Sequence, residues 1–510
     1  MNLTYLYLLA PLHTGGASQE GNLVGIARES HTELPYAPSS TVRGRLRAFS
    51  SDLWTRLILF GPDLDDLKIQ DKDPAKQQKK EALHKKYEDT FGKKLTQLEQ
   101  GKIWIGDASI LWIPVSSLSH SVIWVSCPAL LQRWKIRSGK SDLTLPKAYQ
   151  AYLGEGENES PVYLKDSILK TVKPWDRWKD FVPKPADETL IQRVLVLPDQ
   201  HCASLIQMSL WRQVKVKLDE HKTVDGGFRY EEAIPPDTLM YFPWDLTTQA
   251  KKVGTNDQVR KPEQDPVSMF EGLLAKRPIL QLGGQESLGR GFVEQWTEKK
   301  LSSSSDTEED SVEAKKESEQ TDSDEINSDS EALTSNTEAD ATNTAGETEN
   351  QLVKFDPGEL GKRVYQALTA LRQPYKEALD RGQIQKDVFE KHLKEQKGQA
   401  VELYSYLSTW GLMRLKAEES ALDKWKPGDQ PIVQQRAEKN QEGKREVVES
   451  YFQCLASTAE ENALSGKKAL DVLLAKSTEE YLGLTGLGLA IAQEFSFWAT
   501  AVYYDITGEG

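Results

Sequence analysis

The 510-residue sequence predicts a mixed α/β region, an acidic linker and an all-α region, in that order along the chain. Three observations carry this prediction. Residues 1–300 mix strand-like apolar runs with helix-like segments. Residues 301–350 hold 16 acidic residues, two lysines and no aromatic residue. Residues 351–510 repeat apolar side chains with the period of an α-helix. The chain is long enough for more than one domain at this division.

The elements of the first region follow from local patterns. Residues 3–9 form a continuous apolar run that predicts a buried first strand. Residues 39–54 predict a helix opened by a Ser-Ser-Thr cap. Residues 68–98 are highly charged and predict a helical surface insertion. Two later strands are expected at residues 194–197 and 213–218.

The linker 301–350 cannot bury enough apolar surface to offset its ordering entropy, and we expect it to be disordered. A flexible coil of this length spans roughly 40 Å, enough to tether two docked domains. Its alternative role is an acidic decoy that keeps RNA or a basic partner off a surface until assembly. Because this segment accounts for the whole net charge of −14, the acidity of the chain does not exclude a nucleic-acid partner.

The C-terminal region is expected to be helical throughout. Two apolar stripes have helical spacing: Leu403, Leu407 and Trp410, and Val447, Tyr451 and Leu455. Residues 481–504 are the most apolar stretch, but Gln493 and Glu494 interrupt it and no basic flank orients it. A buried helix is therefore expected there, and no membrane partner.

Cysteine usage and the N-terminus indicate the compartment. Cys127, Cys202 and Cys454 are widely spaced, which argues against a disulfide framework and a zinc ribbon. Residues 1–16 lack the basic region and cleavage site of a signal peptide. We expect a cytoplasmic protein with no metal bound through a clear motif.

A first chemical motif spans residues 35–47, PYAPSSTVRGRLR. Small hydroxyl residues at a helix start offer free backbone N–H groups, and nearby cations add to an anion site. The alternative is a capped helix with a solvated basic face. The candidate phosphate ligands are Ser39, Ser40, Arg43, Arg45 and Arg47.

A second motif, residues 281–291, reads QLGGQESLGRG. Gly283, Gly284 and Gly289 allow a ligand to approach the backbone closely, and Arg290 would clamp a phosphate. By itself such a loop is more often an ordinary turn.

Taken together and in this order, after a first strand that ends in PLHTGG at residues 11–16, the motifs are specific. The chain resembles the RAMP superfamily of CRISPR-Cas systems, most closely the guide-RNA backbone subunit (subunit four) of type III-B (Cmr) effector complexes. Further segments that resemble this family lie at residues 28–32, 106–115, 124–128 and 228–235.

The resemblance implies an α+β, ferredoxin-like (RRM-like) domain over residues 1–300, with insertions. Such domains polymerise along a guide RNA, so that base pairing reads the target sequence. The implied partners are guide RNA, target RNA, a large polymerase-like subunit and further copies of this or related backbone subunits. The two motifs above would hold the guide backbone, and His13 lies where a family loop begins.

The resemblance also implies a departure in chemistry. The family cuts target RNA with a metal and an aspartate, and the position of that aspartate aligns with Leu23, which cannot bind a cation or accept a proton. We expect a subunit that binds target RNA without cutting it. The alternative is a metal-dependent endoribonuclease using Mg²⁺ or Mn²⁺, with Glu20, His13, or a carboxylate of Glu231 or Glu232 rescuing the reaction.

Residues 351–510 resemble the small helical subunit of the same complexes, at residues 403–412 and 477–483. The implied product is a fusion of backbone and small subunit; the alternative is an unrelated interaction domain. Candidate RNA-facing charges, or simply parts of a solvated helix face, are Lys391, Lys394, Lys397, Arg414 and Lys416. A further functional alternative is an RNA-binding adaptor outside any CRISPR complex.

Overall fold

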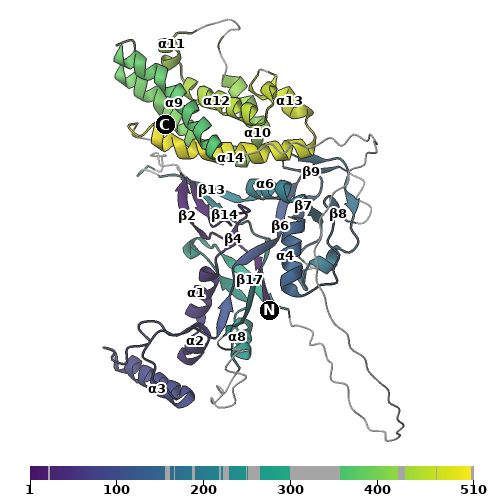
Figure 1. Ribbon diagram of the computed structural model, residues 1–510, viewed down its shortest axis with the longest axis vertical. Helices are drawn as coiled ribbons and strands as arrows, with labels where there is room; N and C mark the ends of the chain where they lie inside the picture. The colour runs from purple at the N-terminus through teal and green to yellow at the C-terminus, as the bar shows by residue number, and fades with distance from the viewer. Residues whose placement is uncertain are drawn as a thin grey trace, which may run out of the picture. The chain divides into compact units, whose positions relative to one another are not determined.

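The computed structural model is shown in Figure 1. It describes residues 1–20, 23–154, 161–165, 167–186, 190–217, 220–221, 229–248, 250, 265–298, 357–422, 425, 431–466 and 468–506. Contacts between residues group Met1–Lys299 with Pro357–Gly510 as one compact unit. The expected linker 301–350 lies outside the described residues.

The larger sheet dominates the first region. Its main path runs β11-β8-β12-β7-β6-β15-β1-β17-β16, with β4, β5, β9 and β10 pairing at its sides. The path strands are β1 (Asn2–Leu8), β6 (Ala108–Ser117), β7 (Ser121–Ser126), β8 (Gln150–Tyr152), β11 (Lys173–Pro174), β12 (Val194–Val196), β15 (Leu239–Leu246), β16 (Ile279–Gln281) and β17 (Phe292–Thr297). The side strands are β4 (Tyr36–Ala37), β5 (Ile103–Ile105), β9 (Val162–Leu164) and β10 (Ser167–Leu169).

The first strand is buried on both faces, as its continuous apolar run predicts. Successive side chains of a strand point to opposite faces. Leu3 and Tyr5 pack with Trp134 of α4 (Pro128–Ser138), while Leu6 packs with Phe270 of α8 (Pro266–Ala275). The strand pairs antiparallel with β15 on one side and β17 on the other.

A second, four-stranded sheet has the order β13-β14-β3-β2. Its strands are β2 (Gly15–Glu20), β3 (Leu23–Ile26), β13 (Trp211–Lys215) and β14 (Arg229–Ala233). Beside it in the chain lies α6 (Asp199–Ser209), which leads directly into β13. The strand at 211–215 starts two residues before the predicted 213–218. The strand at 194–196 is confirmed.

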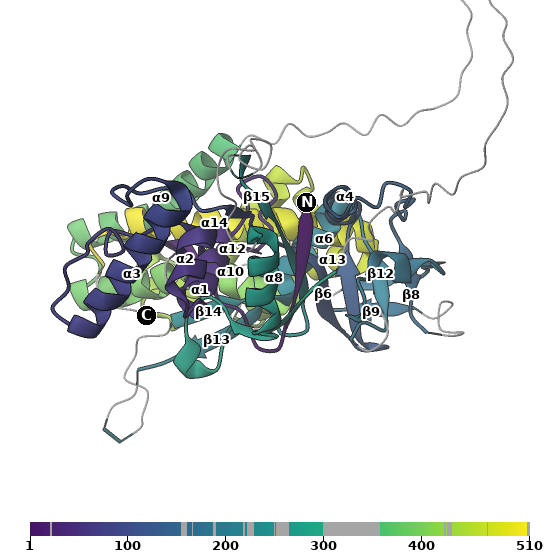
Figure 2. The ribbon, with the colours of Figure 1, turned by 90° about the horizontal axis from the view of Figure 1, so that it is seen from below.

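The helix predicted at 39–54 is wrong in extent, because two helices occupy this stretch. The first, α1 (Ser39–Phe49), ends before Asp52, whose side chain accepts the Thr55 N–H at 2.9 Å and caps α2 (Leu53–Phe60). The predicted hydroxyl cap is also wrong, since no side chain of the N-cap residue bonds to the start of α1. Figure 2 shows α1, α2 and α8 side by side.

The charged insertion contains α3 (Pro74–Phe91), shorter than the predicted 68–98 and capped by Asp73. Its Leu83 and Tyr87 form a small cluster of their own with Leu57 and Leu95. A short 3₁₀ turn, η1 (Trp178–Phe181), completes the cover of the sheet.

The C-terminal region is all helical where it is described. It comprises α9 (Pro357–Asp380), α10 (Lys386–Leu422), α11 (Val433–Glu438), α12 (Glu442–Thr458), η3 (Asn462–Ser465), α13 (Ala469–Ala475) and α14 (Thr478–Val502). The predicted stripe at 447, 451 and 455 is fully buried. Leu403 and Leu407 are buried too, but Trp410 is 47% exposed, directly before the kink of α10 at Gly411.

The most apolar stretch forms α14, which packs against α9, α10 and α12. It is a buried helix, as predicted. Among the helices of the described residues, none combines the length and apolarity needed to cross a membrane.

Candidate nucleic-acid interface

The glycine-rich loop lies against the end of the first strand. Gly284 donates its N–H to the His13 carbonyl at 3.0 Å, and Gly291 donates to the Pro11 carbonyl at 2.9 Å. Gly283 has φ +71°, and a Cβ there would lie 2.2 Å from the His13 carbonyl oxygen. Glycine is required at this close approach. The structure thus brings together two segments that are 270 residues apart in the sequence.

Arg290 is buried rather than presented to solvent. Its guanidinium lies 4.4 Å from the ring centroid of Trp211. It also donates to Glu231 at 3.2 Å and to the side chains of Gln285 and Gln213. Arg290 therefore holds the glycine loop against β13 and β14.

The two carboxylates of β14 point to opposite faces of the small sheet. Glu231 faces Gln213 and the glycine loop, while Glu232 lies opposite Arg212 in the ladder. Glu232 accepts from Arg212 at 2.7 Å and from Arg28 at 2.8 Å, and its side chain is fully buried. Its backbone carbonyl lies 2.8 Å from Nδ1 of His13.

Both carboxylates have lowered pKa values. Burial by itself raises the pKa of Glu232, but the guanidinium groups of Arg212 and Arg28 outweigh it. Burial likewise raises the pKa of Glu231. Hydrogen bonds from Lys215 and Gln285 outweigh burial, so the pKa of Glu231 is lowered overall. Each carboxylate is therefore ionised and already committed to protein partners, which does not suit a free base or metal ligand.

The loop residues nominated for cleavage divide between two places. Glu20 ends β2, and its side chain lies outside the described residues. Leu23 opens β3, pairs with Tyr230 of β14 and is 6% exposed. In the described part of the chain, no three His, Cys, Asp or Glu side chains gather as a metal site requires. The described residues here do not fit a bound divalent cation.

The start of α1 is occupied by protein groups. The Ser39 N–H donates to Asp107 at 2.7 Å, a carboxylate at the position where an anion would bind. Arg43 donates to the Phe60 carbonyl at 2.5 Å, and Arg47 to the Gly61 carbonyl at 2.6 Å. Arg43 and Arg47 thus tie α1 to the end of α2. Ser40 is exposed beside them.

Arg45 joins the first motif to the second. It pairs with Glu286 of the glycine loop at 2.9 Å and lies 4.5 Å from the ring centroid of Phe49. Gly289, with φ +73° and open space around it, is the most accessible glycine of this loop.

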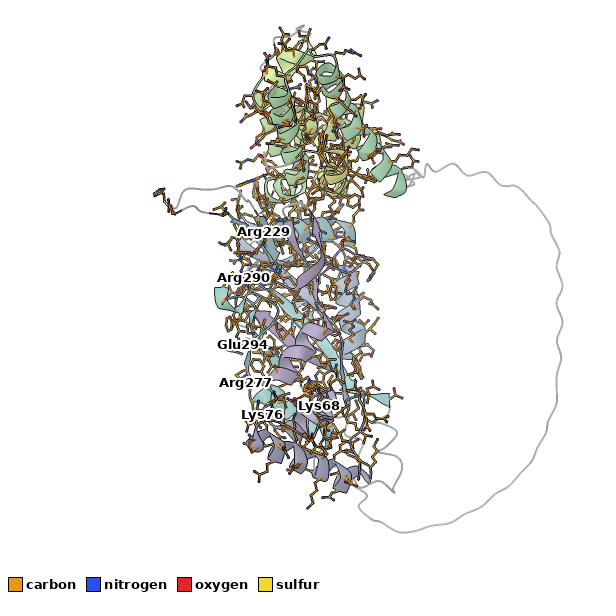
Figure 3. The ribbon with its side chains drawn as sticks, turned by 90° about the vertical axis from the view of Figure 1, so that its left-hand side faces the viewer. Lys68, Lys76, Arg229, Arg277, Arg290 and Glu294 are labelled. Carbon is orange, nitrogen blue, oxygen red and sulfur yellow. The ribbon has the colours of Figure 1, made fainter. Side chains whose placement is uncertain are left out.

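The sequence patterns did not reveal one row of basic residues. Figure 3 shows Arg229, Arg290, Arg277, Lys76 and Lys68 along one side of the first region, with the acidic Glu294 between Arg290 and Arg277. All except Arg290 are exposed, and these four form no salt bridge with a described residue. They come from three separate segments, around residues 68–76, at 229 and at 277, so no local pattern marks them.

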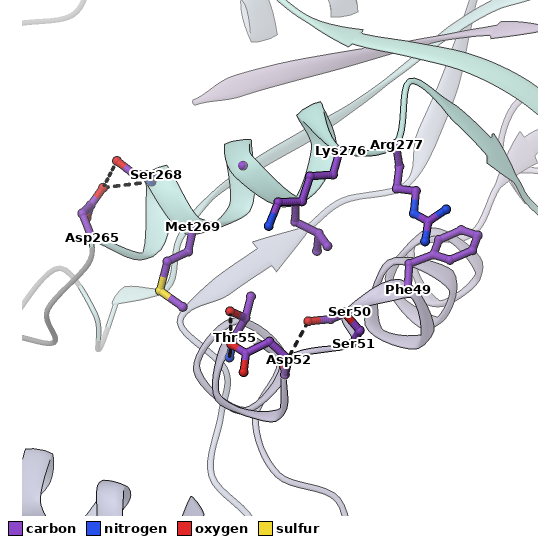
Figure 4. Close-up of a pocket in the computed structure, with 12 residues that line it drawn as sticks. Phe49, Ser50, Ser51, Asp52, Thr55, Asp265, Ser268, Met269, Lys276 and Arg277 are labelled. Atoms are coloured by element: carbon purple, nitrogen blue, oxygen red, sulfur yellow. Dashed lines mark hydrogen bonds between the residues drawn. The ribbon is translucent and has the colours of Figure 1, made fainter.

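A pocket of about 650 Å³ lies along this row, between the junction of α1 with α2 and helix α8. Lys276 and Arg277 reach over it from the end of α8, and Arg277 lies 5.1 Å from the centroid of Phe49 (Figure 4). Asp52 and Asp265 line it, but both accept backbone N–H groups as helix caps.

The candidate RNA-facing charges of the helical region differ in their exposure and in their protein partners. Lys416 is 3% exposed and pairs with Glu419, while Lys397 donates to the Ile506 carbonyl at 2.7 Å. Arg414 stacks at 4.0 Å over Trp410 and pairs with Glu418. Lys391 is exposed and Lys394 is half-buried.

Known proteins resemble the first region. The CRISPR system Cmr endoribonuclease Cmr4 of Pyrococcus furiosus is 27% identical over 313 residues, 57% of this chain and 93% of that protein. The crystal structure of oligomeric Cmr4 from Pyrococcus furiosus has 22% identity, covers 58% of this chain and 96% of its own, and gives a TM-score of 0.38. The cryo-EM structure of the type III-B Cmr-beta bound to cognate target RNA has 17% identity, covers 58% of this chain and 96% of its own, and gives a TM-score of 0.38.

The RAMP superfamily model matches residues 5–294, which is more than half of the chain and spans the first strand, both chemical motifs and the small sheet. The chain therefore belongs to the RAMP superfamily.

Proposed function

We propose that this chain is the guide-RNA backbone subunit of a type III-B CRISPR effector complex and that it binds guide and target RNA in antiviral defence. The observation that carries the proposal is the RAMP match over residues 5–294, reinforced by 27% identity to a Cmr4 protein across 93% of its length. The partners are crRNA, target RNA, further backbone copies and a large polymerase-like subunit.

The proposed architecture has a ferredoxin-like core in residues 1–300, an acidic tether at 301–350 and a small-subunit-like helical domain at 351–510. The antiparallel pairing of β1 with β15 and β17, with helices over both faces, supports such a core. The secondary structure of the described residues after 357, which consists of helices joined by turns, supports the fusion.

We assign the RNA path to the glycine loop and the exposed basic row. The backbone of Gly283, Gly284 and Gly289 lies beside Arg45, and the row Arg229, Arg277, Lys76 and Lys68 continues from there. Exposed cations that form no salt bridge are the groups that release counterions when they bind phosphate, and these four form none with a described residue. Ser39 and Ser40 lie beside this path, whereas Arg43, Arg47 and Arg290 position its loops.

The subunit is proposed to bind target RNA without cutting it. Leu23 is apolar and buried, and Glu231 and Glu232 are held by basic partners, so these positions supply neither a base nor a cation ligand. The competing function is a metal-dependent endoribonuclease, favoured by the similarity to the Cmr endoribonuclease Cmr4 and by the single loop carboxylate Glu20.

The test is to co-express the chain with its neighbouring genes and a repeat array, purify the complex, and add end-labelled complementary RNA with Mg²⁺ or Mn²⁺. Retained, full-length target is expected. Evenly spaced products that vanish with EDTA and with Glu20→Ala would establish the endoribonuclease instead. Absence of co-purified guide RNA would favour an RNA-binding adaptor outside a CRISPR complex.

A further inference from the structure

We propose that the helical domain docks on the small sheet of its own chain, so that each chain is a pre-assembled pair of backbone and helical domains. The docking surface consists of β3, β13, β14 and α6 on one side and α10 and α14 on the other. This inference goes beyond the proposed function and does not depend on RNA.

The apolar part of the surface is shared by both domains. Leu23, Met208 and Tyr230 belong to the same buried cluster as the core of the helical domain. Alternation along β14 places Tyr230 on the face that also carries Glu232. Helix α6 packs against both α10 and α14. The side chains that cover this face of the small sheet are therefore helical-domain side chains.

A buried polar network crosses the same surface. Gln207 Oε1 accepts from Arg28 at 2.9 Å and from the Tyr404 hydroxyl at 2.7 Å. Arg212 Nη1 donates to the Ser408 carbonyl at 3.2 Å while its other nitrogens hold Glu232. Both arginines that neutralise Glu232 thus lie against α10. Buried charges need partners of this kind, which makes the geometry specific.

The kink in α10 supplies one of these partners. Gly411 has φ +80° and ψ 171°, a conformation that glycine adopts readily and other residues rarely do. An unbroken helix uses each carbonyl for the N–H four residues onward, and Gly411 interrupts that ladder beside Ser408. The Ser408 carbonyl accepts from Arg212, and the Met413 N–H beyond the kink donates to the Tyr481 hydroxyl at 3.4 Å. The kink therefore turns helix backbone into a docking contact.

A close helix approach gives a sharp test. A Cβ placed on Gly486 of α14 would lie 3.8 Å from the Cβ of Ser204 on α6. That separation matches the mean Cβ–Cβ distance of a disulfide. Full-length Ser204→Cys/Gly486→Cys chain, oxidised with diamide, is expected to form an intrachain disulfide.

The matched control is Ser204→Cys/Gly483→Cys, because Gly483 lies on the same helix and its Cβ would face open space. With a protease site engineered into residues 301–350, the cut fragments of the Gly486 pair should stay joined on a non-reducing gel. We expect about tenfold less joining for the control pair, whose geometry does not suit a disulfide.

Docking between copies is tested by mixing a tagged Ser204→Cys chain with an untagged Gly486→Cys chain before oxidation. No cross-linked dimer is expected. A dimer band as strong as the intrachain product, or no intrachain disulfide at all, would overturn the proposal. Neither outcome bears on RNA binding, so the proposed function would stand separately.

Discussion

At the residue scale, Leu23 is the position that bears most directly on the proposal that target RNA is bound without being cut. Its apolar side chain belongs to the cluster between the small sheet and the helical domain, and it is 6% exposed. A carboxylate in that environment would be costly because it would lie among buried apolar side chains. Leu23, the residue that the family resemblance places at the position of a catalytic aspartate, thus contributes to packing here.

We predict that Leu23→Asp lowers the free energy of unfolding by roughly 2–4 kcal/mol, since it places a charge among buried apolar side chains. Urea denaturation of the full chain is the measurement. The control, Leu23→Met, keeps volume and polarity and should cost less than about 1.5 kcal/mol. Equal stability of the two variants would contradict the burial of this residue.

Glu232 makes stability depend on pH. Its pKa is lowered in the folded state by Arg212 and Arg28 despite burial, so its stabilisation is complete above the ordinary carboxyl pKa. That stabilisation is lost as pH falls through the lowered pKa, in a window beginning near about pH 4.

Glu232→Gln should destabilise the protein by about 3–5 kcal/mol at neutral pH, because it leaves two buried guanidinium groups without a carboxylate. Its stability should also fall less steeply in acid than that of the unchanged chain. Thermal melts from pH 3 to pH 7 test both expectations. Glu286→Gln, at an ion pair whose carboxylate is 58% exposed, is the control and should change little.

At the element scale, the break in α10 at Gly411 lies beside the Ser408 carbonyl, which accepts a hydrogen bond from Arg212. Gly411→Ala would force an L side chain to adopt φ +80° with ψ 171°, a conformation populated almost only by glycine, which costs roughly 1–3 kcal/mol. If the helix straightened instead, Arg212 would lose the Ser408 carbonyl.

We therefore expect Gly411→Ala to lower the melting temperature and to weaken retention of the helical domain after the linker is cut. Gly483→Ala is the matched control, because Gly483 lies inside α14 without positive φ and with room for a Cβ. That change should be neutral or stabilising by up to about 1 kcal/mol. Similar losses for the two variants would show that the conformation of Gly411 is unimportant.

At the scale of the whole molecule, the basic row Arg229, Arg277, Lys76 and Lys68 should set RNA affinity. Arg277→Ala is expected to weaken binding equally for guides of different sequence, and to lower the slope of log affinity against log salt by about 1. Filter binding at several salt concentrations measures both. Lys386→Ala, at an 81% exposed lysine of the helical domain, is the control. An equal loss for Lys386→Ala would contradict the assigned path.

What the sequence determined by itself is local. The run at residues 3–9 was enough for a buried strand, the period at 447, 451 and 455 for a buried helix face, and the ordered motifs for the RAMP family. These predictions succeed because the period of apolar residues, the conformational freedom of glycine and the order of the motifs can all be read along the chain without knowledge of the fold.

Only the tertiary structure decided which basic side chains are free to bind a ligand. Arg43, Arg47 and Arg290 look like phosphate ligands in sequence. The fold instead gives Arg43 and Arg47 the carbonyls at the end of the next helix, and Arg290 the carboxylate of Glu231 on β14. The Ser408 carbonyl beside the kink at Gly411 has a partner, Arg212, about 200 residues earlier. Whether a charge binds a ligand or another part of the protein depends on which distant groups the fold places within hydrogen-bond distance, and sequence spacing does not contain that information.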